Sequence, residues 1–292
     1  MNPVFSKLVL LALLGTVPGG CTTASSRSQR TSQLPAALAG IPGLVCCWDF
    51  QEPTGAPRQS RGGHAYALQE RNGPIERVAD GVFGPFAARL NEGQWLVAPR
   101  TNCPALDLHG PAAQVTVVAW LKWNPQLRRG CEAVAGVWNE TEKQRQYCLF
   151  LNLGIHNSRN QVCGHVSAIG GPTPGYRYCM DAAIGTNVVP RGVWQCVGFT
   201  YDGEFARAYL NGELDARPGL NPYRYAGGLF DGGPMGADFT VGGVSRSGEM
   251  GNWFAGTLGG LAVFQRALSD AEMRQLAVPV QPANGRPLPQ EW

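Results

Sequence analysis

The sequence lacks long hydrophobic runs and stretches of like charge. Its longest apolar run, residues 8–17, is about half as long as the ~20 residues that a helix needs to cross a bilayer. Charged residues make up 15% of the chain, the formal net charge is +3, and Arg128-Arg129 is its only adjacent basic pair. These absences exclude a membrane-spanning helix and a basic stripe of the kind that binds nucleic acid.

Familiar catalytic motifs are also missing. None of the four histidines (His64, His109, His156 and His165) lies in a Gly-x-Ser-x-Gly setting, which a nucleophilic serine would need. Cys163-x-His165 has the spacing of half a zinc site, but no second close pair accompanies it. These residues favour a role without catalysis and leave an enzyme as the alternative.

Glycine and proline, by contrast, are abundant, with 39 and 22 residues in a chain of 292. This density disfavours long helices and favours many short strands joined by turns. An apolar content of 44% is ample for a sizeable core. We find no internal repeat, and the composition indicates one large domain.

The first 43 residues are predicted to be a targeting segment and a tether. Lys7 precedes the apolar run, as in a signal peptide. Pro18-Gly19-Gly20-Cys21 resembles a bacterial lipobox, in which the cysteine is lipidated; ordinary cleavage after Ala24 is the alternative. We predict a signal peptide over 1–21, a lipid on Cys21 and a flexible tether over 22–43. The protein is then exported and anchored to a membrane, or displayed at the cell surface or in the periplasm.

Eight further cysteines follow Cys21, and an even number in an exported chain favours disulfides. Residues 147–153 and 161–168 have the pattern of two hairpin strands around the polar turn 156–160. Folding about that turn places Cys148 opposite Cys163, within cross-strand reach. We therefore predict a Cys148–Cys163 disulfide.

Hydrophobic periodicity clearly predicts the secondary structure of two further segments. Residues 114–123 alternate as a strand, with Val115 and Val117 on one face and Val118 and Trp120 on the other. Residues 253–276 form a strand followed by a short helix. In that helix Ser269-x-x-Glu272 is a capping box.

These segments carry a family resemblance. Residues 114–123, the block 194–212 ending in Tyr-Leu-Asn-Gly, and the closing segment 253–276 resemble laminin-G-like domains of the concanavalin A-like jelly-roll superfamily. The resemblance covers residues 44–277 and leaves 278–292 as a Pro-rich tail. It implies an all-β, two-sheet antiparallel jelly-roll sandwich with a short C-terminal helix and adjacent first and last strands. Gly259 and Gly260 depart from the family pattern, which has an acidic pair there.

Two loop segments combine aromatic and basic side chains, Tyr176-Arg177-Tyr178 and Tyr223-Arg224-Tyr225. Flat rings bind sugar faces, and arginine offers paired donors to hydroxyl, uronate or sulfate groups. We predict that these six residues bind ligand, together with Trp138 and Trp253. The alternative is that the tyrosines of each Tyr-Arg-Tyr pack inward while the arginine points outward.

A third loop, residues 230–238, is rich in glycine and carries Asp231 and Asp238. Oxygen ligands suit calcium, and some laminin-G-like domains bind it at the rim of the sandwich, so these two aspartates are the candidate calcium ligands. The alternative is a turn in which aspartate caps its own backbone. The chain shows no sign of any other cofactor.

The sequence supports three functional hypotheses. The first is an exported, lipid-anchored module that binds a polysaccharide, a glycoconjugate or extracellular matrix. The second is a glycan-active enzyme with a non-standard site built from Glu140, Glu142, His165, Tyr176 or Tyr178. The third is a structural cell-envelope protein whose loops bind other proteins. The resemblance and the aromatic loops favour the first, although a fold alone does not fix function.

Overall fold

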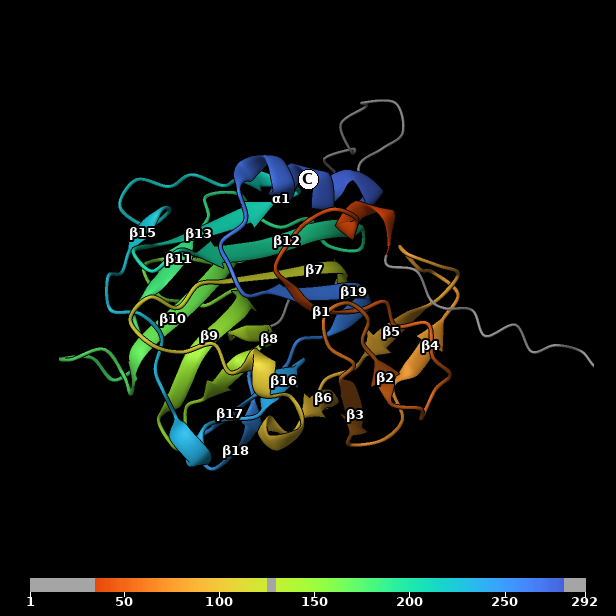
Figure 1. Ribbon diagram of the computed structural model, residues 1–292, viewed down its shortest axis with the longest axis horizontal. Helices are drawn as coiled ribbons and strands as arrows, with labels where there is room; N and C mark the ends of the chain where they lie inside the picture. The colour runs from red at the N-terminus through yellow and green to blue at the C-terminus, as the bar shows by residue number, and fades with distance from the viewer. Residues whose placement is uncertain (1–34, 125–129, 281–292) are drawn as a thin grey trace, which may run out of the picture. The chain divides into compact units, whose positions relative to one another are not determined.

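The computed structural model describes residues 35–124 and 130–280. The predicted signal peptide, Cys21, most of the predicted tether and nearly all of the predicted tail lie outside the described residues. The described chain forms two sheets that pack face to face, as the all-β jelly-roll expectation requires (Figure 1). No helix among the described residues is long and apolar enough to cross a membrane.

The first sheet has nine strands, in the order β14-β13-β12-β7-β19-β5-β4, with β1 paired to β19 and β15 paired to β13. The predicted closeness of the first and last strands is thus confirmed. The strands are β1 (Leu44–Trp48), β4 (Glu76–Val78), β5 (Ala87–Leu90), β7 (Val115–Trp123), β12 (Trp194–Tyr201), β13 (Phe205–Leu210), β14 (Glu213–Leu214), β15 (Tyr223–Arg224) and β19 (Gly256–Phe264).

The second sheet has ten strands, in the order β11-β10-β9-β8-β16-β6-β3-β2, with the short hairpin β17–β18 attached to β8. Apart from one parallel contact between β17 and β8, the described strands pair antiparallel. The strands are β2 (Arg58–Gln59), β3 (Ala67–Arg71), β6 (Trp95–Ala98), β8 (Glu132–Asn139), β9 (Gln144–Leu151), β10 (Val162–Gly170), β11 (Ala182–Ile184), β16 (Phe239–Val241), β17 (Val244–Arg246) and β18 (Glu249–Gly251).

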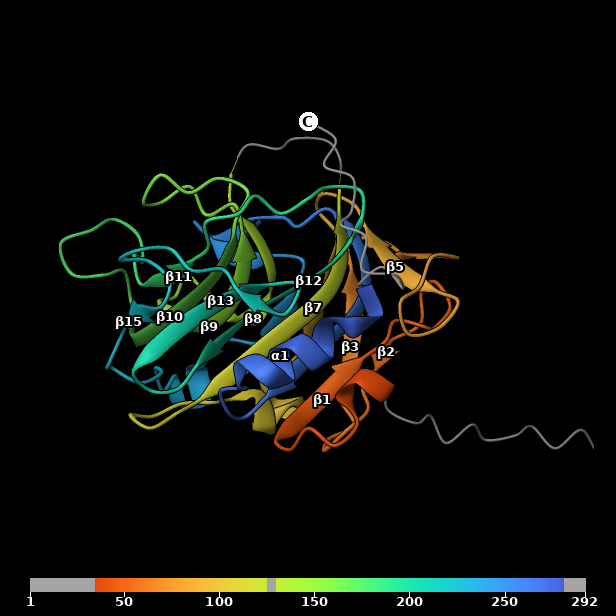
Figure 2. The same cartoon turned by 90° about the horizontal axis from the view of Figure 1, so that it is seen from above.

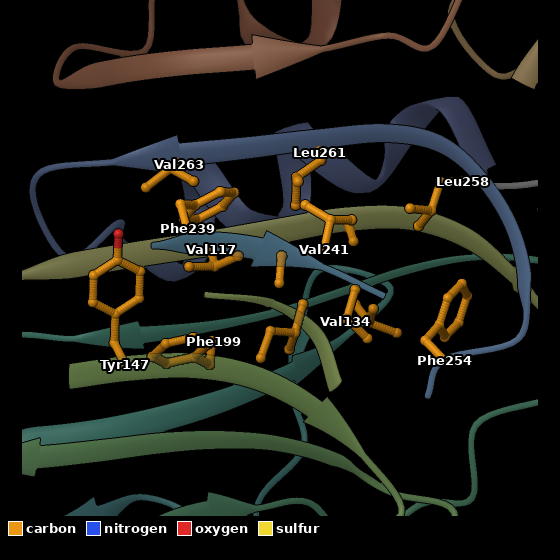
Figure 3. Packing of buried hydrophobic residues seen from close by; sticks show 14 of the residues in the cluster. Val117, Val134, Tyr147, Phe199, Phe239, Val241, Phe254, Leu258, Leu261 and Val263 are labelled. Atoms are coloured by element: carbon orange, nitrogen blue, oxygen red, sulfur yellow. The ribbon is translucent and has the colours of Figure 1, made fainter. Parts of the chain in front are cut away.

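The main core lies between the two sheets (Figure 3). It is built by alternation: Val117 of β7, Phe199 of β12 and Leu261 of β19 meet Tyr147 and Phe239 from the other sheet, all fully buried. Because each strand sends every second side chain inward, the remaining side chains form two outer faces. A helix covers one of these outer faces and leaves the other open, and the candidate site lies on the open face.

The helix α1 (Asp270–Ala277) covers the outer face of the nine-stranded sheet (Figure 2). Met273 and Leu276 are fully buried against Val118 and Trp120, and the Trp120 indole donates to the Leu276 carbonyl at 2.8 Å. The predicted capping box is confirmed, because Ser269 and Glu272 bond each other's backbone amides. Five short 3₁₀ turns complete the described structure, at Ala36–Leu38, Arg100–Asn102, Pro104–Leu106, Gly233–Met235 and Val278–Val280.

The cap also makes a pH-dependent contribution to stability. A bidentate contact from Arg266, with the Ser269 cap, lowers the pKa of Glu272 from 4.5 to about 2. A carboxyl group whose pKa is lower in the folded state stabilises the fold at pH values above its unfolded-state pKa. This contribution is lost as the pH falls toward the folded-state pKa. We expect the stability difference between wild type and Glu272→Gln to shrink between about pH 4.5 and 2 in denaturant unfolding. An equal difference at pH 6 and pH 2 would contradict this assignment.

The predicted Cys148–Cys163 disulfide is wrong. The chain turns at His156 and Asn157, both with positive φ, so Cys148 stands opposite His165 and Cys163 opposite Phe150. The two cysteines are therefore diagonal neighbours, about 7–8 Å apart in a sheet and beyond disulfide reach. All eight cysteines of the described residues are free thiols. Seven of them are buried; Cys131 is half-buried.

Candidate functional site

A pocket of about 240 Å³ opens on the outer face of the ten-stranded sheet, the face that α1 does not cover. We call it the outer-face pocket. It lies over β8, β9 and β10, which run side by side in Figure 1. The β9–β10 turn, the loop between β10 and β11, and the β17–β18 hairpin enclose it. The polar and aromatic residues that line it include Trp138, Glu140, Arg145, His165, Tyr178 and Arg246.

Strand alternation explains the floor of the pocket. On β9 and β10, Tyr147, Leu149 and Val166 point into the main core, so Phe150 and His165 point outward. On β8 Val137 packs in the main core, so the next residue, Trp138, points to the same outer face. Opposite this pair β9 carries one extra residue, Gln146, a β-bulge that goes with Arg145 lining the outer face. Three rings from three neighbouring strands therefore meet.

The three rings pack closely on one another. The His165 imidazole lies 4.8 Å from the Trp138 ring centroid at an angle of 30° and meets Phe150 edge-on at 5.3 Å. Trp138 is only 2% exposed and Phe150 only 1%. The rings are thus a packed floor, and the face of Trp138 is not free to stack on a sugar as the sequence predicted.

His165 is held as a neutral imidazole. Its Nδ1 lies 3.0 Å from the carbonyl of Asp181, which can only accept, so Nδ1 carries the proton and Nε2 keeps its lone pair. Burial is the main reason that the pKa of His165 falls to about 4, and the Asp181 bond only partly opposes it. At neutral pH this side chain offers the pocket a hydrogen-bond acceptor.

We expect the His165 imidazole to titrate near pH 4 in a folded-state NMR titration, against about 6.5 in the urea-unfolded chain. Because the unfolded chain takes up the proton first, stability should fall as pH drops from about 6.5 to 4. A folded-state midpoint at or above 6.5 would show that the ring is solvated and would contradict the packed floor.

One wall of the pocket is a chain of polar contacts. The Asn252 amide donates to Glu140 Oε1 at 3.1 Å, and Arg246 Nη1 donates to Asn252 Oδ1 at 2.6 Å. Asn252 follows β18 with a φ of 50°, and its carbonyl accepts from the Ala133 amide, which ties the hairpin to β8. This wall joins segments more than 100 residues apart in sequence.

The rim of the pocket carries exposed tyrosines on a braced loop. Tyr176 is 59% exposed and Tyr178 44% exposed, and they are the exposed aromatic side chains among the described residues. Thr173 braces their loop: its amide donates to the Tyr178 carbonyl, its hydroxyl to Asp181 Oδ2. The guanidinium of exposed Arg177 lies 5.3 Å from the Tyr178 ring centroid. Tyr178 lines the pocket itself.

The second Tyr-Arg-Tyr segment does not contribute a binding surface. The Tyr223 hydroxyl donates to Asp181 at 3.0 Å, the Tyr225 hydroxyl accepts from the Ala168 amide at 2.8 Å, and both rings pack on the core. Arg224 points outward and pairs with Glu204. For this segment the alternative interpretation is confirmed, because both tyrosine rings point inward and the arginine points outward. Through Asp181, Tyr223 braces the loop that carries the first segment.

The remaining predicted positions lie elsewhere. Trp253 is half-buried, packs on Gly243 and does not line the pocket. Asp231 caps the Gly233 amide and lies 3.7 Å from His109, while Asp238 accepts from the Arg100 amide. The two candidate calcium ligands thus accept hydrogen bonds from two different backbone amides. The described residues contain no group of three or more His, Cys, Asp or Glu side chains placed to hold a metal.

Glu140 and Glu142 both lie in the β8–β9 turn, but their side chains have different surroundings. Glu142 is exposed and bonds back to Asn139, whereas Glu140 enters the pocket. Glu140 is the only carboxylate among the described residues that line the pocket. Glycosidases of the common type need two carboxyl groups across the scissile bond.

Sequence comparison decides the family. A family model described as the concanavalin A-like lectin/glucanases superfamily, Laminin_G_3, matches residues 99–274, more than half of the chain. The chain belongs to this family. No curated protein matches the sequence. Strands β1 to β6, which precede the matched residues, complete both sheets of this laminin-G-like domain.

Solved structures confirm the fold. Domain 4 of AbnA, a GH43 extracellular arabinanase from Geobacillus stearothermophilus in complex with arabinotriose, superposes with a TM-score of 0.54 at 18% identity, covering 80% of this chain and 98% of that domain. Trypanosoma rangeli sialidase in complex with sialic acid gives 0.55 at 19% identity over 81% of this chain. The laminin-G-like chain spans only 33% of the sialidase.

The departure at Gly259 and Gly260 has a steric cause. A Cβ on Gly259 would lie 2.8 Å from the Trp194 ring, and one on Gly260 would lie 2.5 Å from the Phe83 ring. Aromatic side chains fill the space on this side of β19. The family's acidic pair has no room here, and the candidate site of this laminin-G-like domain is the outer-face pocket instead.

Proposed function

We propose that this protein is a carbohydrate-binding module of the laminin-G-like type and that the outer-face pocket is its ligand site. The observation that carries the proposal is the exposed Tyr178 ring at the rim of a partly open pocket that is lined by both polar and apolar side chains. Such a ring stacks on the apolar face of a sugar, while His165 Nε2 and the guanidinium donors suit its hydroxyl groups. The sugar complex recorded for domain 4 of the arabinanase supports a saccharide as the class of ligand.

Binding is favoured over hydrolysis by the chemistry of the pocket. Glu140 is bonded to Asn252 and has no carboxylate partner among the lining residues. His165, with a pKa of about 4, is a weak base at neutral pH. The enzyme alternative therefore lacks the paired acid and base that glycan cleavage usually requires.

We also propose that the protein is exported and anchored through a lipid on Cys21. The support is the sequence order of Lys7, the apolar run and the lipobox-like Pro18-Gly19-Gly20-Cys21. Free thiols are compatible with an oxidising compartment if they are unreactive. Burial raises the pKa of Cys163 to about 12 and of Cys131 to about 11, so little thiolate forms.

The test is retention of the full-length protein on a panel of immobilised polysaccharides, with the supernatant assayed for new reducing ends. We expect retention without release, and loss of retention by about fivefold or more for Tyr178→Ala, since stacking on an exposed ring contributes about 1 kcal/mol or more. Met235→Ala is the matched control, because Met235 is 76% exposed and outside the pocket. Retention that survives replacement of both Tyr176 and Tyr178 would contradict the site, and new reducing ends would favour the enzyme.

A further inference from the structure

The outer-face pocket contains a buried guanidinium that no carboxylate balances. Arg145 is 5% exposed, and its Nη1 donates to the Gly170 carbonyl at 3.0 Å. Its Nε is buried, and no acceptor among the described residues bonds to it. Glu140 acts on Arg145 from a longer range, because within the described residues the two form no ion pair under 4.0 Å. The Arg145 guanidinium carbon also lies 5.9 Å from the Trp138 ring centroid. A buried positive charge with no carboxylate in contact is costly, so this arrangement favours an anion.

A second guanidinium faces the same space. Arg246 is half-buried and uses Nη1 to hold Asn252, and no other bond from its guanidinium to a described residue is formed. Asn252 in turn occupies one oxygen of Glu140. Since His165 is neutral, the ionised groups lining the pocket are two arginines and one glutamate. The pocket therefore carries a net positive charge and has free donors on both guanidinium groups.

The size of the pocket limits what can enter. Its volume of about 240 Å³ lies below the roughly 300–1,000 Å³ of pockets that enclose drug-sized ligands. The β9–β10 turn, the β10–β11 loop and the β17–β18 hairpin border the pocket, which is partly open to solvent. A single sugar ring fits this shape, whereas the middle of a polysaccharide chain needs an open groove.

We propose that the outer-face pocket binds one anionic sugar unit at the end of a glycan chain, with its carboxylate or sulfate group on the free donors of Arg145 and Arg246. This inference rests on the proposed carbohydrate-binding function and names the class of sugar. Guanidinium groups suit both anions, because their paired N–H donors match two oxygens at once. Tyr178 then covers the ring and His165 Nε2 accepts from a hydroxyl.

The test follows the Trp138 indole N–H and the His165 imidazole by NMR in the full-length protein. The probes are glucuronate, glucose 6-sulfate and glucose, at equal ionic strength. We expect a response to one or both anionic probes at concentrations at least about tenfold below that needed for glucose. A response to glucuronate alone assigns the carboxylate, and a response to glucose 6-sulfate alone assigns the sulfate. A trisaccharide with glucuronate at its non-reducing end should bind at least about tenfold more tightly than one with the same unit internal.

Variants link the response to the two arginines. Arg246→Gln should raise the Kd for the anionic probe about tenfold or more, a larger factor than the rise expected for glucose. Arg145→Lys keeps the charge but loses the planar pair of donors, and it should also weaken binding, with thermal unfolding checked alongside. Arg224→Gln is the control, because Arg224 is exposed and lies outside the pocket.

Equal responses to glucose and glucuronate, or an unchanged Kd in Arg246→Gln, would overturn the anionic assignment. Retention on neutral polysaccharides would in that case leave the proposed function standing. Conversely, a response to glucuronate from a protein that no polysaccharide retains would contradict polysaccharide binding and preserve the anion site. A preference for the internal unit would overturn the end-binding assignment.

Discussion

Replacing Arg58 by methionine is expected to lower the free energy of unfolding by about 3–5 kcal/mol, because it leaves a buried carboxylate without its partner. The Arg58 side chain is fully buried and pairs with Glu70, whose side chain is 8% exposed. The same guanidinium donates to the carbonyls of Glu52, Pro53 and Ile75, so three loop carbonyls lose their donor as well. Denaturant unfolding at neutral pH measures the effect.

The matched control is Arg89→Met. Arg89 pairs with Glu76 on the nine-stranded sheet, but the two side chains are 50% and 55% exposed. Exposed pairs contribute about 0–1 kcal/mol, so this variant should unfold almost like wild type. Removing Glu70 together with Arg58 should recover part of the loss, since no unpaired charge then remains buried. Equal effects of Arg58→Met and Arg89→Met would show that the Arg58 site is solvated.

Replacing Trp138 by alanine is expected to cost about 3–5 kcal/mol of stability, as for other buried aromatic side chains. The indole is 2% exposed and packs against His165 and Phe150, so its removal leaves a cavity under the pocket. The sequence alone placed Trp138 among the ligand-binding residues, a role for which its replacement would mainly reduce ligand binding. Thermal or denaturant unfolding distinguishes the two outcomes directly.

The control for Trp138 is Tyr178→Ala at the rim of the same pocket. Because Tyr178 is 44% exposed, its removal should change the free energy of unfolding by no more than about 0.5 kcal/mol. If Trp138→Ala proved as stable as Tyr178→Ala, the indole would have to be a surface residue, and the packed floor would be wrong.

Local patterns in the sequence predicted most of the fold. Alternation over residues 114–123 put Val117 and Trp120 on opposite faces of a strand, and this is confirmed, because Val117 packs in the main core and Trp120 packs under α1. The Ser269–Glu272 capping box located the helix correctly. These predictions succeed because a strand's two-residue period and a helix cap depend on neighbours in the chain. Strand register is harder to predict from the sequence. The hairpin turn is centred on His156-Asn157, so Cys148 pairs with His165 and not, as expected, with Cys163.

The candidate site was predicted only in part. Exposed Tyr176 and Tyr178 were selected correctly as loop aromatics, and Glu140 and His165 were named in the enzyme alternative. Arg145, Arg246 and Asn252 were missed. Arg145 lies inside a strand, and Arg246 and Asn252 belong to a hairpin more than 100 residues from Glu140. No spacing in the sequence connects them, because a pocket of this kind is assembled by strands that are neighbours only in the sheet.

By itself, then, the sequence determined the strands, the capped helix and the laminin-G-like family, since these follow from periodicity and motifs along the chain. The tertiary structure decided which outer face stays open. The helix α1 covers one sheet, while on the other sheet strand alternation, a β-bulge on β9 and the β17–β18 hairpin bring Trp138, Arg145 and Arg246 to one space. The two Tyr-Arg-Tyr segments show the same division: although they are identical in sequence, both tyrosines of one are exposed, whereas both tyrosines of the other are half-buried against the core. Burial depends on what the rest of the chain places opposite, and no local pattern records that.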